Sequence, residues 1–189
     1  MDQSYVGLNS TFDYLTKEPE SIIANREVSM LGVWSVSSCK SGYGVRNLRD
    51  NSLETYWQSD GVQPHWVAVE YPKKTNIRKI GIYMDYLQDE SYTPSKITIL
   101  SGYTFLDLKV ETELDLYEPK GWRFVELFDE DHNYIRAFIL QIKITNNHQS
   151  GRDTHLRQVK IYAPIAESNV PKAIGEFTDP NYLKYNYIK

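Results

Sequence analysis

Cysteine is almost absent from this sequence of 189 residues, which contains only Cys39. A single thiol excludes an intrachain disulfide, whereas secreted modules of similar size are often held together by disulfides. Residues 1–25 are polar and partly acidic, and they lack the apolar core of a secretory signal. We therefore expect a protein of a reducing, intracellular compartment. We interpret Cys39 as a small buried residue rather than a nucleophile.

Long apolar runs and basic clusters are missing as well. No apolar run approaches the about 20 residues that a helix needs to cross a bilayer. The formal net charge is -4, and the densest basic points are the pairs at 73–74 and 78–79. Nucleic-acid-binding proteins usually carry a longer basic stripe or patch. The sequence thus predicts neither a membrane nor a nucleic acid as a partner.

The sequence also lacks amphipathic helices, because no segment repeats apolar residues with a period of 3.6 over three helical turns. Apolar and polar residues instead alternate in short segments at 67–71, 77–84, 96–100, 138–144 and 159–163. A period of two places every second side chain on one face of a sheet. Short strands in succession without helices between them favour an antiparallel sandwich or barrel over an α/β fold. We predict an all-β fold.

The alternating pattern also divides the chain. We predict one β-sandwich domain at residues 26–166, preceded by an N-terminal extension at 1–25. Periodicity stops after Pro164, and the following stretch contains Pro171, Gly175 and Pro180. We interpret residues 167–189 as a flexible tail that orders only on a partner.

Three loops are richer in polar groups than a turn requires. They comprise residues 50–61 with 64–66, residues 89–95, and residues 146–155. The third loop is much longer than the two to five residues that usually close a hairpin, and it offers amide, imidazole, guanidinium, carboxylate and hydroxyl groups. Because binding residues concentrate in loops on a rigid scaffold, we favour a recognition role. The structural alternative is that Asn147 and Gly151 shape the turn while Arg152 and Asp153 pair with each other.

The first polar loop has a stronger structural interpretation. Tyr56 and Trp57 are expected to pack beneath the sandwich, and a side chain at 50 or 51 is expected to bond backbone amides. Its exposed polar groups are then Ser59, Asp60 and His65, which are candidates for a ligand-binding surface.

Catalysis and metal binding find little support in these loops. Ser150, Asp153 and His155 are the residue types of a hydrolase triad, but there is no Gly-x-Ser-x-Gly nucleophile motif. His148 and His155 lie seven residues apart, which matches no zinc spacing, and one cysteine cannot complete a site. Calcium is unsupported. We predict no catalytic residue, no metal and no cofactor.

Four segments together carry a specific resemblance. Residues 35–40, 53–61 with 63–65, 89–96 and 147–155 resemble, in the right order, the signature segments of the DOC domain, and the likeness covers about residues 28–168. The resemblance implies a jelly-roll β-sandwich of the galactose-binding, discoidin-like type. It also implies a small core subunit of the anaphase-promoting complex, a ubiquitin ligase of the cell cycle, with no ubiquitin chemistry of its own and a location in nucleus and cytoplasm.

The same resemblance implies partners and contact residues. With an activator of the WD-repeat type, such a subunit forms a co-receptor for destruction-box substrates and raises substrate affinity and processivity. The contact residues expected for the degron or the activator are Asn147, His148, Gln149, Arg152, Asp153, Thr154 and His155, with Ser59, Asp60, His65, Ser91 and Tyr92.

The end of the chain adds one further expectation. Members of the family finish in Ile-Arg, which docks on a tetratricopeptide-repeat subunit, and this chain finishes in Ile188 and Lys189. Ile188 matches, whereas Lys189 keeps the charge but loses the planar five-donor fork of arginine. We expect these two residues to anchor the chain to that subunit.

A free carbohydrate- or small-ligand-binding module is the alternative function, because this fold often binds sugars. It requires Trp57, Trp66 or Trp122 to be exposed for stacking. The lack of disulfides and of a secretory signal argues against it.

Overall fold

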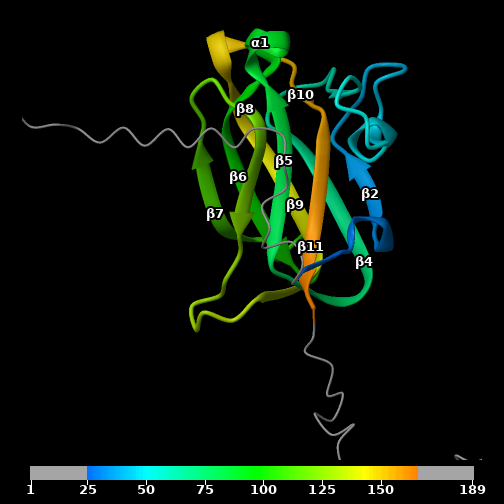
Figure 1. Ribbon diagram of the computed structural model, residues 1–189, viewed down its shortest axis with the longest axis vertical. Helices are drawn as coiled ribbons and strands as arrows, with labels where there is room; N and C mark the ends of the chain where they lie inside the picture. The colour runs from blue at the N-terminus through cyan, green and yellow to red at the C-terminus, as the bar shows by residue number, and fades with distance from the viewer. Residues whose placement is uncertain (1–24, 166–189) are drawn as a thin grey trace, which may run out of the picture.

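Two antiparallel β-sheets pack face to face in the part of the chain that the computed structural model describes, residues 25–165 (Figure 1). One sheet contains, in spatial order, β1 (Asn25–Glu27), β11 (Gln158–Pro164), β5 (Lys79–Asp85) and β8 (Lys120–Glu126). The other contains β2 (Val33–Val36), β4 (His65–Ile77), β9 (Ile135–Asn147), β6 (Pro94–Gly102) and β7 (Lys109–Asp115). The predicted all-β sandwich is confirmed.

Short elements join the strands. A small ribbon pairs β3 (Trp57–Gln58) with β10 (His155–Leu156). The helical pieces are α1 (Tyr86–Asp89) and the 3-10 turns η2 (Ser29–Leu31), η3 (Val45–Leu48), η4 (Glu90–Tyr92) and η5 (His148–Ser150). None of the helices between residues 25 and 165 is long and apolar enough to span a membrane.

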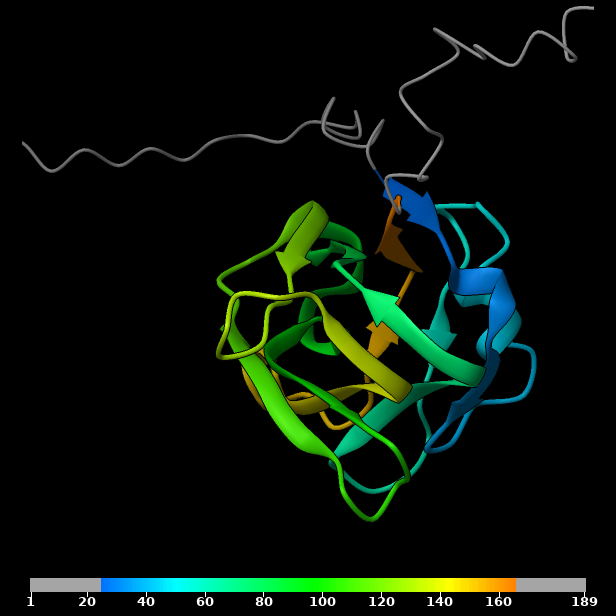
Figure 2. The ribbon, with the colours of Figure 1, turned by 90° about the horizontal axis from the view of Figure 1, so that it is seen from below.

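The core lies between the two sheets, which enclose one interior when seen along the strands (Figure 2). The four-stranded sheet contributes Ile80, Ile82 and Met84, all nearly inaccessible to solvent, from alternate positions of β5. The five-stranded sheet contributes Val67 on β4, which lies opposite Ile142 on β9. The predicted alternation of β5 therefore agrees with the faces that the strand presents.

Cys39 is exposed, so its predicted burial is wrong. It lies in the loop between β2 and β3, where the backbone makes the packing contacts. Lys40 donates its N–H to the carbonyl of Gln58, and the Ser38 carbonyl accepts from the indole of Trp57. The backbone thus anchors the loop to the domain, and the thiol is left on the solvent side.

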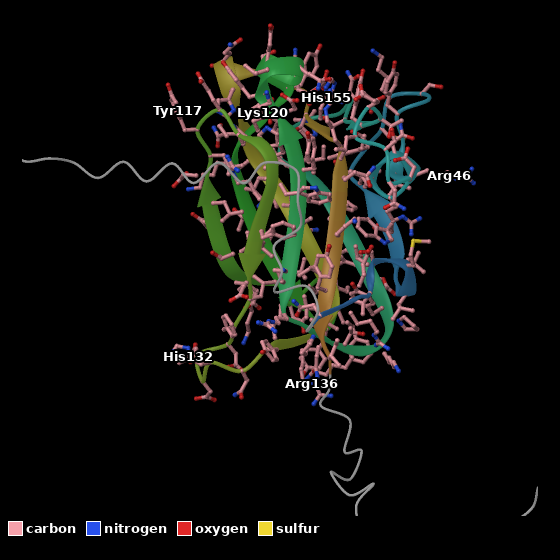
Figure 3. All side chains as sticks on the ribbon, in the orientation of Figure 1. Arg46, Tyr117, Lys120, His132, Arg136 and His155 are labelled. Atoms are coloured by element: carbon pink, nitrogen blue, oxygen red, sulfur yellow. The ribbon has the colours of Figure 1, made fainter. Side chains whose placement is uncertain are left out.

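The three polar loops converge at one end of the sandwich. Figure 1 shows α1 and β10 together at that end, and Figure 3 places His155 there, with His132 and Arg136 at the opposite end. The connection from β5 to β6 passes through α1 and η4, and the connection from β9 to β10 passes through η5. Residues far apart in the sequence therefore meet at the same end.

Candidate functional site

Hydrogen bonds join the three loops directly. Thr154 donates its N–H to Ser59 Oγ at 2.9 Å, and Ser59 N–H donates to the Thr154 carbonyl at 3.1 Å. His148 N–H donates to the Thr93 carbonyl at 2.9 Å. The first and second loops are therefore both attached to the third, and the three form one surface.

Gly151 allows the third loop to lie directly on the second. A Cβ atom at this position would lie 1.8 Å from the carbonyl oxygen of Ser91, which no side chain can accept. The turn before it is tight, because Gln149 and Ser150 have φ angles of 50° and 58° and Gly151 N–H donates to the His148 carbonyl. The backbone conformation of the loop is therefore specified by its own tight turn as well as by its contact with the second loop.

Asn147 closes the base of the third loop. Its side-chain amide donates to the carbonyls of Gly151, at 3.3 Å, and Asp153, at 2.7 Å. The structural interpretation of Asn147 and Gly151 is thus confirmed. The pair expected in the same interpretation is not seen, because no ion pair joins Arg152 to Asp153 in the described part of the chain.

His148 connects three backbone segments. Its Nε2 accepts the N–H of Glu118 at 3.1 Å, so the ring proton resides on Nδ1, which lies 3.0 Å from the Thr93 carbonyl and donates to it. The ring also packs against Tyr86 with 4.9 Å between centroids. Both nitrogens are therefore already engaged, and His148 positions the loop rather than offering a free donor.

A buried ionic cluster lies beneath the loops. Arg157 donates from Nε to Asp89 Oδ2 at 2.9 Å and from Nη2 to Asp89 Oδ1 at 2.8 Å. His155 Nδ1 lies 3.0 Å from the same Oδ1, and the three side chains are almost inaccessible to solvent. Because a carboxylate only accepts, the Nδ1 proton of His155 points at Asp89.

The cluster shifts the ionisation of its members. Burial by itself would raise the pKa of Asp89, but hydrogen bonds from His155 and Arg157 outweigh it and hold the pKa below its ordinary value. Burial would likewise lower the pKa of Arg157, and the hydrogen bond to Asp89 reverses this and raises it. The pair therefore stays ionised wherever the domain is folded near neutral pH.

Aromatic rings enclose His155 on both faces. Tyr56 stacks on one face with 4.1 Å between centroids, and Tyr92 stacks on the other at 4.2 Å. Tyr43 extends the stack at 4.9 Å from Tyr56, and the guanidinium of Arg157 lies 5.4 Å from the Tyr56 ring. Tyr92 belongs to η4 in the second loop, so the stacked rings connect that loop to Tyr56 in the first loop and to His155 in the third.

The predicted contact residues separate into two groups. Ser59, His65, Thr154, Asn147 and His155 are buried, so the expected exposure of Ser59 and His65 is wrong. His155 bonds the side chain of Asp89, whereas the polar atoms of the other four hold loop backbone: His65 Nε2, for example, lies 2.6 Å from the carbonyl of residue 152. The half-buried or exposed members at this end are His148, Gln149, Arg152, Asp153, Asp60, Ser91 and Tyr92.

Sequence reasoning missed the ionic cluster. The sequence patterns placed Asp89 at the start of a polar loop but predicted no role for it, and they predicted no role for Arg157. The one local signal was that Arg157 follows His155 by two residues, in the gap between β10 and β11. The identity of their partner was not accessible, since Asp89 lies 68 residues from Arg157.

The geometry offers no catalytic or metal arrangement at this end. Within residues 25–165, no hydrogen bond joins Ser150 to His155, whose ring is enclosed by two tyrosines. No group of three His, Cys, Asp or Glu residues suited to a metal occurs in the same part of the chain. Trp57 is fully buried and cannot stack on a sugar, while Trp66 and Trp122 pack against neighbouring rings on the sheets.

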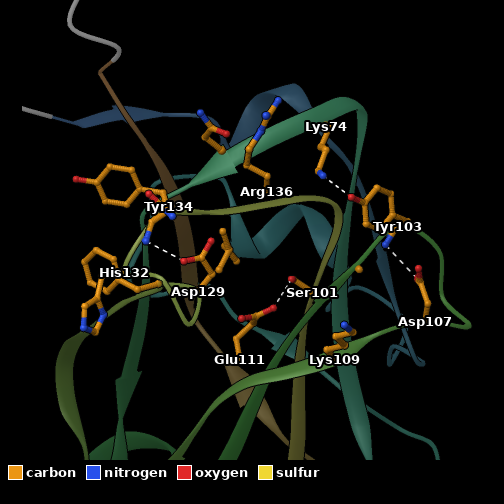
Figure 4. A pocket seen from close by; sticks show the side chains of 15 residues that line it. Lys74, Ser101, Tyr103, Asp107, Lys109, Glu111, Asp129, His132, Tyr134 and Arg136 are labelled. Atoms are coloured by element: carbon orange, nitrogen blue, oxygen red, sulfur yellow. Dashed lines mark hydrogen bonds between the residues drawn. The ribbon is translucent and has the colours of Figure 1, made fainter.

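A cavity of about 890 Å³ lies at the opposite end of the sandwich, and none of the predicted contact residues lines it (Figure 4). Two of its carboxylates are bonded to neighbouring protein groups. Asp107 accepts the N–H groups of Tyr103 and Thr104, and Glu111 accepts the hydroxyl proton of Ser101. We therefore place the candidate recognition site at the end formed by the three polar loops.

Solved structures similar to this one share its fold. A family 32 carbohydrate-binding module of Clostridium perfringens in complex with galactose superimposes with a TM-score of 0.61 at 15% identity, over 73% of this chain and 98% of that one. A chitosan-binding module of Paenibacillus gives 0.59 at 15% identity, over 73% and 99%. Such identities carry information about the fold alone, and they confirm the galactose-binding type of jelly roll.

Sequence comparisons cover nearly the whole chain. The family model described as "Anaphase-promoting complex, subunit 10 (APC10)" matches residues 8–187. Relatives named anaphase-promoting complex subunit 10 are 47% identical in Mus musculus, over 92% of this chain and 93% of the relative, and 41% identical in Schizosaccharomyces pombe, over 84% and 87%. The chain belongs to the family of anaphase-promoting complex subunit 10.

Proposed function

We propose that this chain is a non-catalytic substrate-recognition and processivity subunit of the anaphase-promoting complex, a ubiquitin ligase of the cell cycle. In this proposal the loop end forms a destruction-box co-receptor with a WD-repeat activator. A tetratricopeptide-repeat subunit anchors the chain through Ile188 and Lys189, which lie outside the described residues. The proposal implies a location in nucleus and cytoplasm, where cell-cycle substrates are degraded.

One observation supports the proposal most directly. Gln149, Arg152 and Asp153 display amide, guanidinium and carboxylate groups on a loop whose backbone is held by partly buried hydrogen bonds, and of the three only the Gln149 amide has a side-chain partner in the described residues, the hydroxyl of Tyr86. Within residues 25–165, no hydrogen bond or ion pair occupies the side chain of Arg152 or the carboxylate of Asp153. A rigid loop with unengaged polar groups loses little entropy on binding an extended peptide.

The expected chemistry is contact formation. Each polar contact contributes about 1 kcal/mol net, so the loop alone binds a degron weakly. Weak binding suffices when the activator holds the same substrate at a second point, because linked sites gain effective concentration. Longer retention of the substrate then allows more ubiquitins to be added in one encounter.

The test uses the assembled ligase with its activator. The variant Gln149→Ala, Arg152→Ala, Asp153→Ala removes the three displayed groups and leaves the buried frame in place. We expect substrate affinity to fall at least about tenfold and ubiquitin chains to become shorter. Reactions are compared at equal amounts of incorporated subunit.

A matched control exists at the other end of the domain. The variant Asp131→Ala, Asn133→Ala, Arg136→Ala removes a carboxylate, an amide and a guanidinium from exposed positions. We expect it to behave as the wild type. Unchanged processivity in the loop variant, or an equal loss in the control, would refute the co-receptor role.

The anchoring part of the proposal has a separate readout. Deletion of residues 187–189 is expected to reduce recovery of the chain with the assembled ligase, because Ile188 and Lys189 form the proposed contact. Recovery equal to that of the full chain would remove the anchor from the proposal and leave the loop surface unaffected.

A further inference from the structure

A fourth loop lies at the same end of the sandwich as the three polar loops. It comprises residues 116–119, between β7 and β8, and Figure 3 shows its Tyr117 at the end that also holds His155. Four residues are an ordinary length for a hairpin loop, so the sequence patterns predicted no role for it. Its place in the fold makes it a neighbour of the proposed recognition surface.

The backbone of this fourth loop is held by its neighbours. Glu118 donates its N–H to Nε2 of His148 at 3.1 Å, and its φ angle of 41° is one that residues with a side chain rarely adopt. The carbonyl of Pro119 accepts the N–H of Tyr86 at 2.9 Å, and the ring of Tyr86 packs on that of His148. The fourth loop therefore has a fixed position relative to α1 and to the third loop.

Tyr86 also makes the surface continuous from the third loop to the fourth. Its hydroxyl accepts the side-chain amide of Gln149 at 3.0 Å, while its N–H bonds the fourth loop. Gln149 directly follows His148 in the chain, and Tyr117 directly precedes the residue that His148 bonds. The displayed amide and the ring of Tyr117 thus belong to one surface.

Tyr117 projects from this fixed backbone into solvent. It is 85% exposed, which is the largest exposed fraction of any aromatic residue between 25 and 165. No hydrogen bond or ring contact engages its side chain in that part of the protein. Single exposed apolar side chains are common on protein surfaces, so exposure alone would require no explanation. The position of the ring beside the polar groups of the third loop is what indicates a role.

An open groove of about 560 Å³ adjoins the ring. Its walls come from the second, third and fourth loops and the adjoining strands, and they are formed by Ser95, Lys96, Asp115, Leu116, Tyr117 and Asn146. Lys96 already pairs with Glu113 at 3.0 Å, so its charge is compensated within the domain. A groove of this size, with apolar and polar walls, can receive an apolar side chain of a bound peptide.

We propose that Tyr117 is the apolar contact of the recognition surface for an extended substrate segment. An apolar side chain of the segment packs on the ring and in the adjoining groove, while Gln149, Arg152 and Asp153 contact its polar groups. Loop groups beside a groove suit an extended segment, because such peptides place individual side chains in pockets. Tyrosine is also among the residues that dominate binding at interfaces, and a ring on a fixed loop loses little entropy. The inference rests on the proposed function and adds the apolar part of the ligand.

Hydrogen exchange of the full chain tests whether the third loop fixes the fourth. We expect His148→Ala to speed exchange of the Glu118 amide at least about tenfold, because the acceptor of this N–H is removed. The amide of Leu116 is the internal control, since it donates to the carbonyl of Ser95 at 2.8 Å and should keep its protection. Unchanged exchange at Glu118 would show that the two loops are not coupled and would overturn the inference.

Binding of a fluorescent destruction-box peptide to the assembled ligase with its activator tests the contact itself. We expect Tyr117→Ala to weaken peptide affinity about tenfold, and Tyr117→Phe to bind like the wild type, because the ring is retained. Tyr103→Ala is the matched control, because Tyr103 is also exposed, at 55%, but lines the cavity at the opposite end. An equal loss in Tyr103→Ala would overturn the inference.

The remaining outcomes separate this inference from the proposed function. If Tyr117→Ala retains full peptide affinity while the variant Gln149→Ala, Arg152→Ala, Asp153→Ala loses it, the inference is wrong and the proposed function stands. If neither variant loses affinity, both are wrong. If Tyr117→Ala weakens binding of the activator without substrate, and peptide affinity stays intact at saturating activator, Tyr117 contacts the activator and the inference is overturned.

Discussion

Asp89 and Arg157 form a two-point ion pair in the interior of the domain, with N–O distances of 2.9 Å and 2.8 Å. A further N–H of the guanidinium, from Nη1, donates to the carbonyl of Leu53 at 2.8 Å. Leu53 belongs to the first polar loop, Asp89 begins the second, and Arg157 follows the third. One side chain therefore fixes the relative positions of the three loops that form the proposed recognition surface.

Asp89→Asn should destabilise the domain strongly. The change leaves the cation of Arg157 buried without its counter-charge, and breaking a buried pair in this way costs about 3–5 kcal/mol. Urea unfolding near neutral pH measures the loss. Asp153→Asn serves as the control, because that carboxylate is half-buried and bears no ion pair in the described residues, and its cost should stay within about 0.5 kcal/mol. Equal effects of the two changes would contradict a special role for the pair.

Acid should weaken the same interaction. The folded-state pKa of Asp89 is depressed below the ordinary value of 3.8, so the unfolded chain takes up the proton first. The stability that the pair contributes is therefore complete above that value and is lost as the pH falls through the folded pKa. Unfolding free energies of the wild type and Asp89→Asn, measured from neutral pH downward, should converge below pH 3.8. A constant difference at all pH values would contradict the linkage.

Gly151→Ala should displace the third loop. The new methyl group would fall 1.8 Å from the Ser91 carbonyl oxygen, so the loop must lift from η4, at a cost of about 1–3 kcal/mol. We expect the domain to remain folded and substrate processivity in the assembled ligase to fall. Gly44→Ala is the matched control, because its Cβ would meet only Cys39 Sγ at an ordinary 3.9 Å. If Gly151→Ala retains full processivity, the position of the third loop does not matter for substrate processivity, and the prediction is wrong.

Removal of His155 should have a cost that depends on the replacement. Alanine leaves a gap between Tyr56 and Tyr92 and removes the hydrogen bond to Asp89, for a loss of about 2–4 kcal/mol. Phenylalanine keeps both ring contacts and loses only the hydrogen bond, so it should cost about 1–2 kcal/mol. Thermal or urea unfolding of the two variants distinguishes these terms. If both variants lose the same stability, stacking contributes nothing measurable.

Cys39 should react in the folded protein. Because its thiol is exposed, a disulfide reagent should label it at the rate of a small-molecule thiol, without prior unfolding. Cys39→Ser should change stability by less than about 0.5 kcal/mol. Labelling that requires denaturant would show that the loop shields the thiol.

Local patterns in the sequence were sufficient for the fold and for the choice of the three loops that form the candidate site. Alternation at 80, 82 and 84 identified β5 and its core face, since a strand projects successive side chains to opposite sides. The length and composition of 146–155 indicated a loop that does more than turn the chain. The DOC-domain segments then indicated the family, because several loops in fixed order are far more specific than any one motif.

Only the tertiary structure shows which polar residues of the candidate site are buried supports and which are exposed. Ser59, His65 and His155 are polar residues in polar loops, and their local sequence resembles that of Arg152 and Asp153. They differ because Ser59 bonds Thr154, 95 residues away, and His155 bonds Asp89, 66 residues away. Burial and pairing over such separations depend on how the two sheets bring loops together. The sequence therefore specified which segments form the candidate site, and long-range packing determined which of its side chains are buried supports and which remain exposed.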